Sequence, residues 1–216
     1  MNRIIITAGA TRNPIDAIRY LSAHATGTTG TELLNRLLSW QDVDFLGSAE
    51  AILRIPKNAA YSVNAVEFQG TRDLMSKMER LVPHATVVVH SAAVGDYEMA
   101  QVVDTKIPSN QEEITLRLTP TPKILDRVRA WNPTCYLVSF KAAAPGTLVE
   151  QLEDIARKQL QRTGSDLVFA NVIGDTEKVL LVGGTETESV SRSLALIKLA
   201  SWVQQKHGDR DTRVWG

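Results

Sequence analysis

Thr86-Val87-Val88-Val89-His90 is the stretch that decides the fold class, because its residues have high β propensity and its centre is continuously apolar. Such a run is typical of a strand that helices cover on both faces of a parallel sheet. Similar runs recur at Arg3–Ile6, Tyr136–Phe140 and Leu167–Ala170, each followed by loop residues and a helix-like segment. This order predicts an α/β, Rossmann-like three-layer fold with a mainly parallel central sheet.

Helices are expected between and after these strands. The candidate helices are Thr28–Trp40, Thr71–Leu81, Pro122–Ala130, Leu148–Arg162 and Ser191–Gln205. Several of them open with Thr or Pro, as helix starts often do. Two further β-rich runs, Val179–Val182 and Glu186–Val190, flank the turn Gly183-Gly184. They predict a late antiparallel hairpin at an edge of the sheet.

The length of 216 residues predicts a single domain that spans residues 1–216. Within it, Ala100–Glu113 is polar, rich in turn residues and without periodicity, which indicates a surface flap of about residues 98–115. The last residues, about 207–216, are expected to form a frayed tail.

The composition argues against several classes of partner. Lys and Arg together number 24, as do Asp and Glu, so no overall field favours nucleic acid. No apolar run reaches the roughly 18 residues that a membrane helix needs, and the start has no signal-peptide pattern. The single cysteine, Cys135, has no partner for a disulfide within the chain. We therefore expect a cytoplasmic protein without nucleic-acid or membrane partners.

Two stretches of small residues let the backbone approach a phosphate closely. The first strand ends in Thr7–Thr11 (TAGAT), which includes Gly9, and His24–Gly30 (HATGTTG) leads directly into a helix. Neither matches the dinucleotide fingerprint or the P-loop, because the glycine spacing differs and the Lys-Ser/Thr pair is missing. The alternative interpretation is a tight turn followed by a helix cap.

A second set of small and polar residues, His90–Tyr97 (HSAAVGDY), follows the Thr86–His90 strand. In α/β folds the carboxyl edge of the sheet holds ligands. There Asp96 could accept from a ribose hydroxyl or hold Mg²⁺, or it could simply cap a helix. The four histidines show no ligand spacing, so a zinc site is not expected.

Several cations are candidates for phosphate contacts. Lys106 lies in the flap, where it could close over a phosphate or remain a solvated surface lysine. Lys158 and Arg162 stand one turn apart on a predicted helix. They could form a triphosphate-binding stripe or an ordinary solvent-facing surface.

Together these segments resemble the phosphopantothenate–cysteine ligase family, in its short stand-alone form. The resemblance spans nearly the whole chain and rests on six segments in the family's order: ITAGATRNPIDAIRYLSAHATGTTG, HSAAVGDY, TKIPS, TPTPKILDRVRAWNP, LVSFK and ARKQLQRTGSDLVFAN. The resemblance implies that CTP or ATP activates the phosphopantothenate carboxylate as an acyl-nucleotide, from which the amine of cysteine displaces the nucleotide. It also implies Mg²⁺, a homodimer and no flavin.

The resemblance assigns roles to residues of this chain. Lys106 is implied as the catalytic flap lysine over the phosphates. The implied nucleotide site consists of Ala92, Ala93, Asp96, Lys106, Thr121, Pro122, Lys123, Ile124, Phe140, Lys158 and Arg162. We add Gly9 to this site, because it lies in the first small-residue stretch that can approach a phosphate. The implied phosphopantothenate site consists of Ala23, His24, Ala25, Thr26 and Gly27.

The chain departs from the family's pattern at Ala23, where the family normally carries Asn. An alanine side chain can neither donate nor accept a hydrogen bond. This departure favours an alternative function, a ligase-like protein that binds nucleotide or phosphopantothenate without full activity. A nicotinamide or flavin oxidoreductase is a third hypothesis, but the chain lacks the GxGxxG fingerprint and the matching acid that such enzymes use.

Overall fold

The computed structural model describes residues 3–37, 42–56, 63–175 and 177–211. Among these residues an eight-stranded sheet has the strand order β12-β11-β10-β9-β6-β1-β4-β5. Its strands are β1 (Arg3–Ala8), β4 (Val43–Gly47), β5 (Val63–Glu67), β6 (Ala85–His90), β9 (Tyr136–Ala143), β10 (Leu167–Val172), β11 (Lys178–Gly183) and β12 (Glu186–Ser191). All neighbouring strands from β10 to β5 are parallel.

The order of the parallel strands reverses at the centre of the sheet. From β1 the chain proceeds outward to β4 and β5, and then returns across β1 to build β6, β9 and β10 on the other side. The carboxyl ends of β1 and β6 therefore lie at a topological switch point, where open α/β sheets bind their ligands. This confirms the predicted Rossmann-like class.

Helices cover both faces of the sheet. One face carries α1 (Thr28–Arg36), α2 (Ala49–Leu53) and α6 (Arg192–Asp211), and the other carries α3 (Thr71–Leu81), α4 (Val128–Trp131) and α5 (Val149–Thr163). Short 3₁₀ turns, η2 (Val82–His84) and η3 (Ile124–Arg127), precede β6 and α4.

Successive residues of the central strands point into different cores. Ile4 and Val89 belong to the core under α1 and α6, whereas Ile5 and Val88 belong to the core under α3. All four side chains are fully buried. A strand buried on both faces favours apolar residues at successive positions, which explains the continuous apolar runs of the sequence.

The late hairpin is confirmed, since β11 pairs antiparallel with both β10 and β12 at one edge of the sheet. The end of the chain differs from the expectation. Helix α6 continues to Asp211, and His207 within it is buried, with its Nδ1 2.7 Å from Thr86 Oγ1. Residues 212–216 of the predicted tail, like residues 38–40 of the predicted first helix, lie outside the described residues. None of the described helices is long and apolar enough to cross a membrane.

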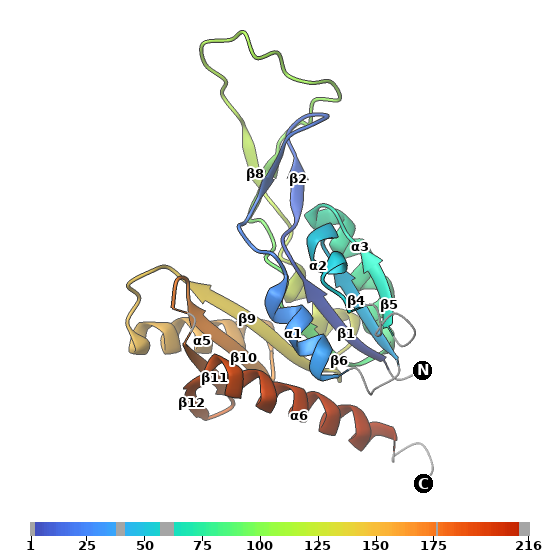
Figure 1. Cartoon of the computed structure of the whole chain (residues 1–216), viewed down its shortest axis with the longest axis vertical. Helices are drawn as coiled ribbons and strands as arrows, with labels where there is room; N and C mark the ends of the chain where they lie inside the picture. Colours follow the sequence, from blue (N-terminus) through green and yellow to red (C-terminus); the bar gives the residue numbers. More distant parts are fainter. Residues whose placement is uncertain (1–2, 38–41, 57–62, 176, 212–216) are drawn as a thin grey trace.

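Two short antiparallel hairpins form an arm that was not predicted from the sequence. The arm consists of β2 (Arg12–Pro14), β3 (Tyr20–Ser22), β7 (Tyr97–Met99) and β8 (Leu118–Pro120). It rises from the carboxyl edge of the sheet and carries the loop of residues 100–117 at its tip (Figure 1). Strands β4 and β5 were also missed.

The predicted flap is anchored to this arm through Asp16. The Ile107 N–H donates to Asp16 Oδ2 (3.0 Å), and the Arg19 guanidinium donates both to Asp16 Oδ2 (2.6 Å) and to the Ile107 carbonyl (3.2 Å). Burial by itself raises the pKa of the Asp16 carboxyl, but the N–H groups of Ile18, Ile107 and Arg19 lower it to about 2, with a further contribution from the Arg19 charge. The carboxylate therefore stays ionised and holds the flap along the arm.

Candidate active site

A cavity of about 360 Å³, named cavity A, opens at the carboxyl ends of β6, β9 and β10. It gathers many of the sequence-predicted residues from five separate segments. Those lining it are Ala25, Ala92, Ala93, Asp96, Thr121, Lys123, Ile124, Phe140 and Arg162. Its position beside the switch point agrees with the general rule for ligands of doubly wound sheets.

A second cavity of about 460 Å³, named cavity B, lies next to cavity A. It is lined by Ala23, His24, Ala25 and Thr26 of the predicted phosphopantothenate site, together with Ala10, Arg12, Tyr20, Ser22 and Glu50. Ala25 lines both cavities, so a molecule in one can meet a molecule in the other. A still larger cavity of about 760 Å³ lies between the arm and the start of α3, but none of the predicted site residues line it.

Gly9 and Gly27 form the narrow junction behind these cavities. Both have positive φ angles, +89° and +80°, which only glycine adopts readily. A Cβ on Gly9 would lie 2.1 Å from Ser48 Oγ, and a Cβ on Gly27 would lie 3.0 Å from the Gly9 nitrogen. The two glycines therefore let the end of β1 pack directly against the start of α1 and the loop before α2.

The start of α1 carries no side-chain cap. Gly27 is its N-cap residue, and no side-chain hydrogen bond satisfies the free N–H groups of the first turn. Such a helix terminus attracts anions through its exposed N–H groups and its dipole. Thr29 of this turn lines cavity A next to Ala25. An anion such as a phosphate is therefore favoured at this end of the cavity.

The loop after β6 is held rigidly by its neighbours. Ala93 N–H donates to the Gly9 carbonyl (2.8 Å), and Gly95 N–H donates to Thr11 Oγ1 (2.9 Å). On the other side, Thr121 Oγ1 donates to the Gly95 carbonyl (2.6 Å). These bonds preorganise the small residues Ala92 and Ala93, so the backbone lining cavity A needs little reordering when a ligand binds.

The charged groups of cavity A are mostly paired. Lys123 lies 2.5 Å from Asp96, and Arg162 is paired with Asp126. Lys141 is half-buried in the cavity, and its ammonium has no hydrogen-bond or ion-pair partner among the described residues. Lys141 is therefore available for an anionic ligand.

Gly27 and four other predicted residues do not line either cavity. Gly9 lies behind them, as described above, and Pro122 does not line them although its neighbours do. Lys158 is exposed on α5 and does not face cavity A, whereas Arg162 does. Lys106 is exposed on the anchored flap, away from both cavities of its own chain.

Sequence reasoning missed several polar residues of cavity A. They include Lys141, Gln159 and Asn171, of which Lys141 and Asn171 could have been found because they occur at the ends of predicted parallel strands. His90, at the start of the small and polar stretch singled out in the sequence, also lines the cavity. His90 Nδ1 lies 3.0 Å from Thr7 Oγ1. Burial lowers the pKa of His90 to about 4, so its imidazole is neutral at neutral pH.

No cluster of three or more metal-ligating side chains occurs within residues 3–37, 42–56, 63–175 and 177–211. Cavity A does contain the carboxylates of Asp96 and Asp126. Mg²⁺ is often held by one or two carboxylates together with phosphate oxygens. This donor set therefore fits Mg²⁺ that arrives with a nucleotide better than a resident metal ion.

Relatives of this chain are found both in sequence and in structure. It is 36% identical over 188 residues to the coenzyme A biosynthesis bifunctional protein CoaBC of Thermococcus kodakarensis, and 27% identical over 171 residues to that of Haemophilus influenzae. These alignments cover 84% and 78% of this chain but only 45% and 40% of the relatives. The chain thus spans less than half the length of the curated relatives it matches.

Solved structures agree with the fold. The DNA/pantothenate metabolism flavoprotein from Streptococcus pneumoniae superimposes with a TM-score of 0.81 at 27% identity, over 94% of this chain and 98% of that one. A Cab2 mutant in complex with phosphopantothenate-cysteine has the same fold, with a TM-score of 0.78 at 17% identity over 97% and 89% of the two chains. The sequence profile of the DNA/pantothenate metabolism flavoprotein C-terminal domain matches residues 1–201. The chain therefore belongs to the family of the DNA/pantothenate metabolism flavoprotein C-terminal domain.

Proposed function

We propose that this chain is a phosphopantothenate–cysteine ligase of coenzyme A biosynthesis, which uses CTP or ATP. The observation that carries the proposal is the adjacency of cavities A and B, which share Ala25 and are lined by most of the predicted nucleotide residues and most of the predicted phosphopantothenate residues, respectively. The relatives named for coenzyme A biosynthesis support the same pathway. We further propose that the chain is a single domain that acts in the cytoplasm, where Cys135 remains a buried thiol.

The reaction has two steps. First, a carboxylate oxygen of phosphopantothenate attacks the α-phosphorus of the nucleotide, and the bond to the β-phosphate oxygen breaks to release pyrophosphate. Then the amine of cysteine attacks the acyl carbon, the bond to the nucleotide oxygen breaks, and the amine loses a proton. The shared wall at Ala25 supports an arrangement with the carboxylate in cavity B and the α-phosphate in cavity A.

The first step brings two anions together, so positive charge must offset their repulsion. The uncapped N-terminus of α1 and the ammonium of Lys141 supply it at cavity A. Arg162 and Lys123 can exchange their present carboxylate partners for phosphate oxygens. The carboxylates thus released, Asp96 and Asp126, can then hold Mg²⁺, which would further neutralise the triphosphate.

Lys106 requires a second subunit in this proposal. It lies on the arm, remote from the cavities of its own chain, so the proposed homodimer places it over cavity A of the partner. Large apolar side chains exposed on the arm support such contacts. They are Ile18, Tyr20, Tyr97, Val102, Val103, Ile114, Leu116 and Leu118.

A Val102→Asp/Ile114→Asp double variant is expected to shift the chain from dimer to monomer, because charges in an apolar interface lose solvation without gaining partners. Both side chains are exposed, at 42% and 44%. Light scattering coupled to size-exclusion chromatography measures the mass. Ile197→Asp, on α6 and 50% exposed, is the matched control that should remain dimeric. A parent chain that is monomeric at micromolar concentration would contradict the proposed homodimer.

The function is tested by separating the two steps. Pyrophosphate release from CTP or ATP with phosphopantothenate reports the first step, and cysteine-dependent amide formation, measured by mass spectrometry, reports both. Ala23 lines cavity B and cannot donate or accept a hydrogen bond. We expect Ala23→Asn to raise the rate of amide formation roughly 10²- to 10³-fold, the usual effect of one charge-stabilising donor.

The controls separate the competing functions. Pyrophosphate release should be nearly equal in the parent and in Ala23→Asn, because the added amide acts in the second step. Equal amide formation in both proteins would show that Ala23 suffices. Absence of pyrophosphate from both proteins, with either nucleotide, would refute the ligase and leave the alternative of a binding protein.

A further inference from the structure

Gln159 is a buried amide in the wall of cavity A whose hydrogen bonds define its orientation. It lies on α5 and is 8% exposed. Its Nε2 donates to Ser139 Oγ (2.9 Å) and to the Phe140 carbonyl (3.1 Å). Both N–H groups of the amide are therefore engaged with β9.

This orientation cannot be reversed. A carbonyl only accepts hydrogen bonds, so a flipped amide would place its oxygen against the Phe140 carbonyl oxygen. The Phe140 backbone is itself fixed, because the Phe140 ring stacks on Phe169 with 4.6 Å between the ring centroids.

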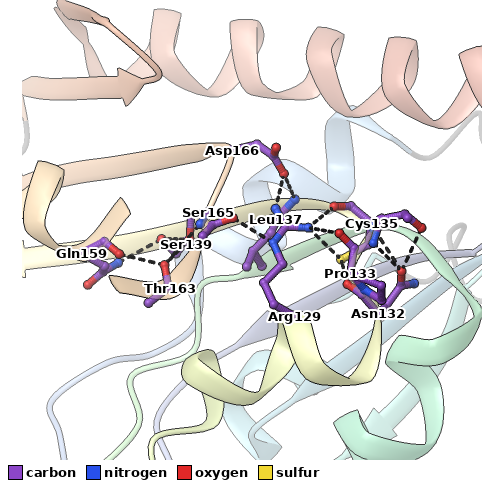
Figure 2. Close-up of polar contacts among 12 residues, drawn as sticks. Arg129, Asn132, Pro133, Cys135, Leu137, Ser139, Gln159, Thr163, Ser165 and Asp166 are labelled. Atoms are coloured by element: carbon purple, nitrogen blue, oxygen red, sulfur yellow. Dashed lines mark hydrogen bonds and ion pairs between the residues drawn. The ribbon is translucent and has the colours of Figure 1, made fainter. Parts of the chain in front are cut away.

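Ser139 is held by further hydroxyl groups (Figure 2). Ser165 Oγ donates to Ser139 Oγ (2.9 Å) and lies 2.7 Å from Thr163 Oγ1. The Thr163 hydroxyl in turn donates to the backbone carbonyl of Gln159 (2.8 Å). The contacts close a ring between β9 and α5, so the Gln159 side chain is rigid before any ligand binds.

The remaining polar atom of this side chain is Oε1, which has no partner among the described residues. It is an acceptor at the wall of cavity A, on the same strand-and-helix wall as Phe140. A polar wall atom without a protein partner gains a hydrogen bond only from a ligand or from water. It therefore favours a ligand that presents an N–H donor at this position.

The position of Gln159 in cavity A indicates which part of a nucleotide it meets. Phosphates are favoured at the α1 end, near Ala25 and Thr29, while Gln159 lies on α5, which packs on the opposite face of the sheet from α1. A nucleotide with its phosphates at the α1 end places its base on the α5 side. We propose that Gln159 Oε1 accepts a hydrogen bond from the exocyclic amino group of cytosine and thereby selects CTP over UTP. This inference rests on the proposed function.

The physical basis is the difference between the two bases. Uracil carries an oxygen where cytosine carries the amino group, and two facing acceptors repel each other when water is excluded. We expect CTP to be preferred over UTP roughly 10- to 100-fold in kcat/KM for pyrophosphate release, and by a similar factor in Kd.

The test compares Gln159→Met with Gln161→Met. Methionine preserves the length of the side chain but removes the acceptor, and Gln161 is the exposed glutamine on the opposite side of α5. Titration calorimetry gives Kd for CTP and for UTP, and the pyrophosphate assay gives kcat and KM. We expect Gln159→Met to reduce the CTP-to-UTP ratio to about 1, mainly by weakening CTP, and Gln161→Met to leave the ratio unchanged.

A second variant tests the inference without changing Gln159 itself. Ser139→Ala removes one of the two acceptors that orient the amide but leaves the bond to the Phe140 carbonyl, so an intermediate ratio is expected. Pyrophosphate release with an unchanged ratio in both variants would overturn the inference and leave the proposed function. A binding preference for CTP that disappears in Gln159→Met, in a protein that releases no pyrophosphate, would support the inference and refute the function. Absence of nucleotide binding would overturn both.

Discussion

A Gly9→Ala variant is expected to lose about 3 kcal/mol of unfolding free energy and to release pyrophosphate roughly 10²-fold more slowly. The added Cβ would lie 2.1 Å from Ser48 Oγ and 2.7 Å from Ser48 Cβ, so the loop between β4 and α2 must move. The Gly9 carbonyl accepts from Ala93 N–H, and the Ser48 N–H donates to the Ala8 carbonyl. Movement at Gly9 therefore displaces the loop that lines cavity A.

The chain contains a matched control for this substitution. Gly174 has the same φ angle of +89°, but a Cβ there would meet no atom within 4 Å. Gly174→Ala should therefore cost only the backbone strain of a left-handed residue, about 1 kcal/mol. Urea unfolding followed by circular dichroism measures both losses. Equal losses in the two variants would mean that the contact with Ser48 has no effect on stability.

An Arg129→Met variant is expected to lose about 3 kcal/mol of unfolding free energy. Its KM for nucleotide should stay unchanged, because Arg129 lies at the edge of the sheet opposite the cavities. Its guanidinium donates to the carbonyls of Gly164 (2.8 Å) and Cys135 (2.7 Å) and to Asp166 (2.7 Å). Asp166 also accepts from the Leu137 N–H (2.7 Å). Figure 2 shows this arginine reaching from α4 toward the starts of β9 and β10.

Removing the guanidinium leaves these acceptors without their donor, and the Asp166 carboxylate without its positive partner. Arg72→Met is the control, since Arg72 also pairs with a carboxylate, that of Glu98, but its side chain is 72% exposed. That exposed pair should contribute less than about 1 kcal/mol. Thermal and urea unfolding of both variants, with Arg129→Lys as a partial rescue, measure the difference. If Arg129→Met is no less stable than Arg72→Met, the proposed stabilising role of this network is wrong.

The strands that the sequence predicted share one property. The strands at Thr86–His90 and Arg3–Ile6 each contain three successive apolar residues, because helices cover both faces of the sheet there. Strands β4 and β5 escaped prediction for different reasons. Strand β4 contains the buried Asp44, which is paired with Arg3, and β5 is the edge strand, where Asn64 and Glu67 interrupt the apolar pattern.

The hairpins of the arm had no signal in the sequence. Strands such as β2 and β7 span only three residues each, too few for a periodic pattern. They are held by tertiary bonds, for example from Asn13 Nδ2 to the Tyr97 carbonyl (2.8 Å), between residues far apart in the chain. The anchoring of the flap at Asp16 depends on the same kind of contact.

The sequence by itself determined the α/β class, the edge hairpin and most of the residues at the carboxyl edge, because strand ends and small-residue loops are local features. Tertiary structure alone decided which side of α5 faces cavity A. Lys158 and Gln159 are neighbours in sequence, and a rotation of about 100° per residue directs Lys158 to solvent and Gln159 into the cavity wall. Only the packing of α5 on β9 fixes that rotation, since it depends on contacts between residues distant in the chain.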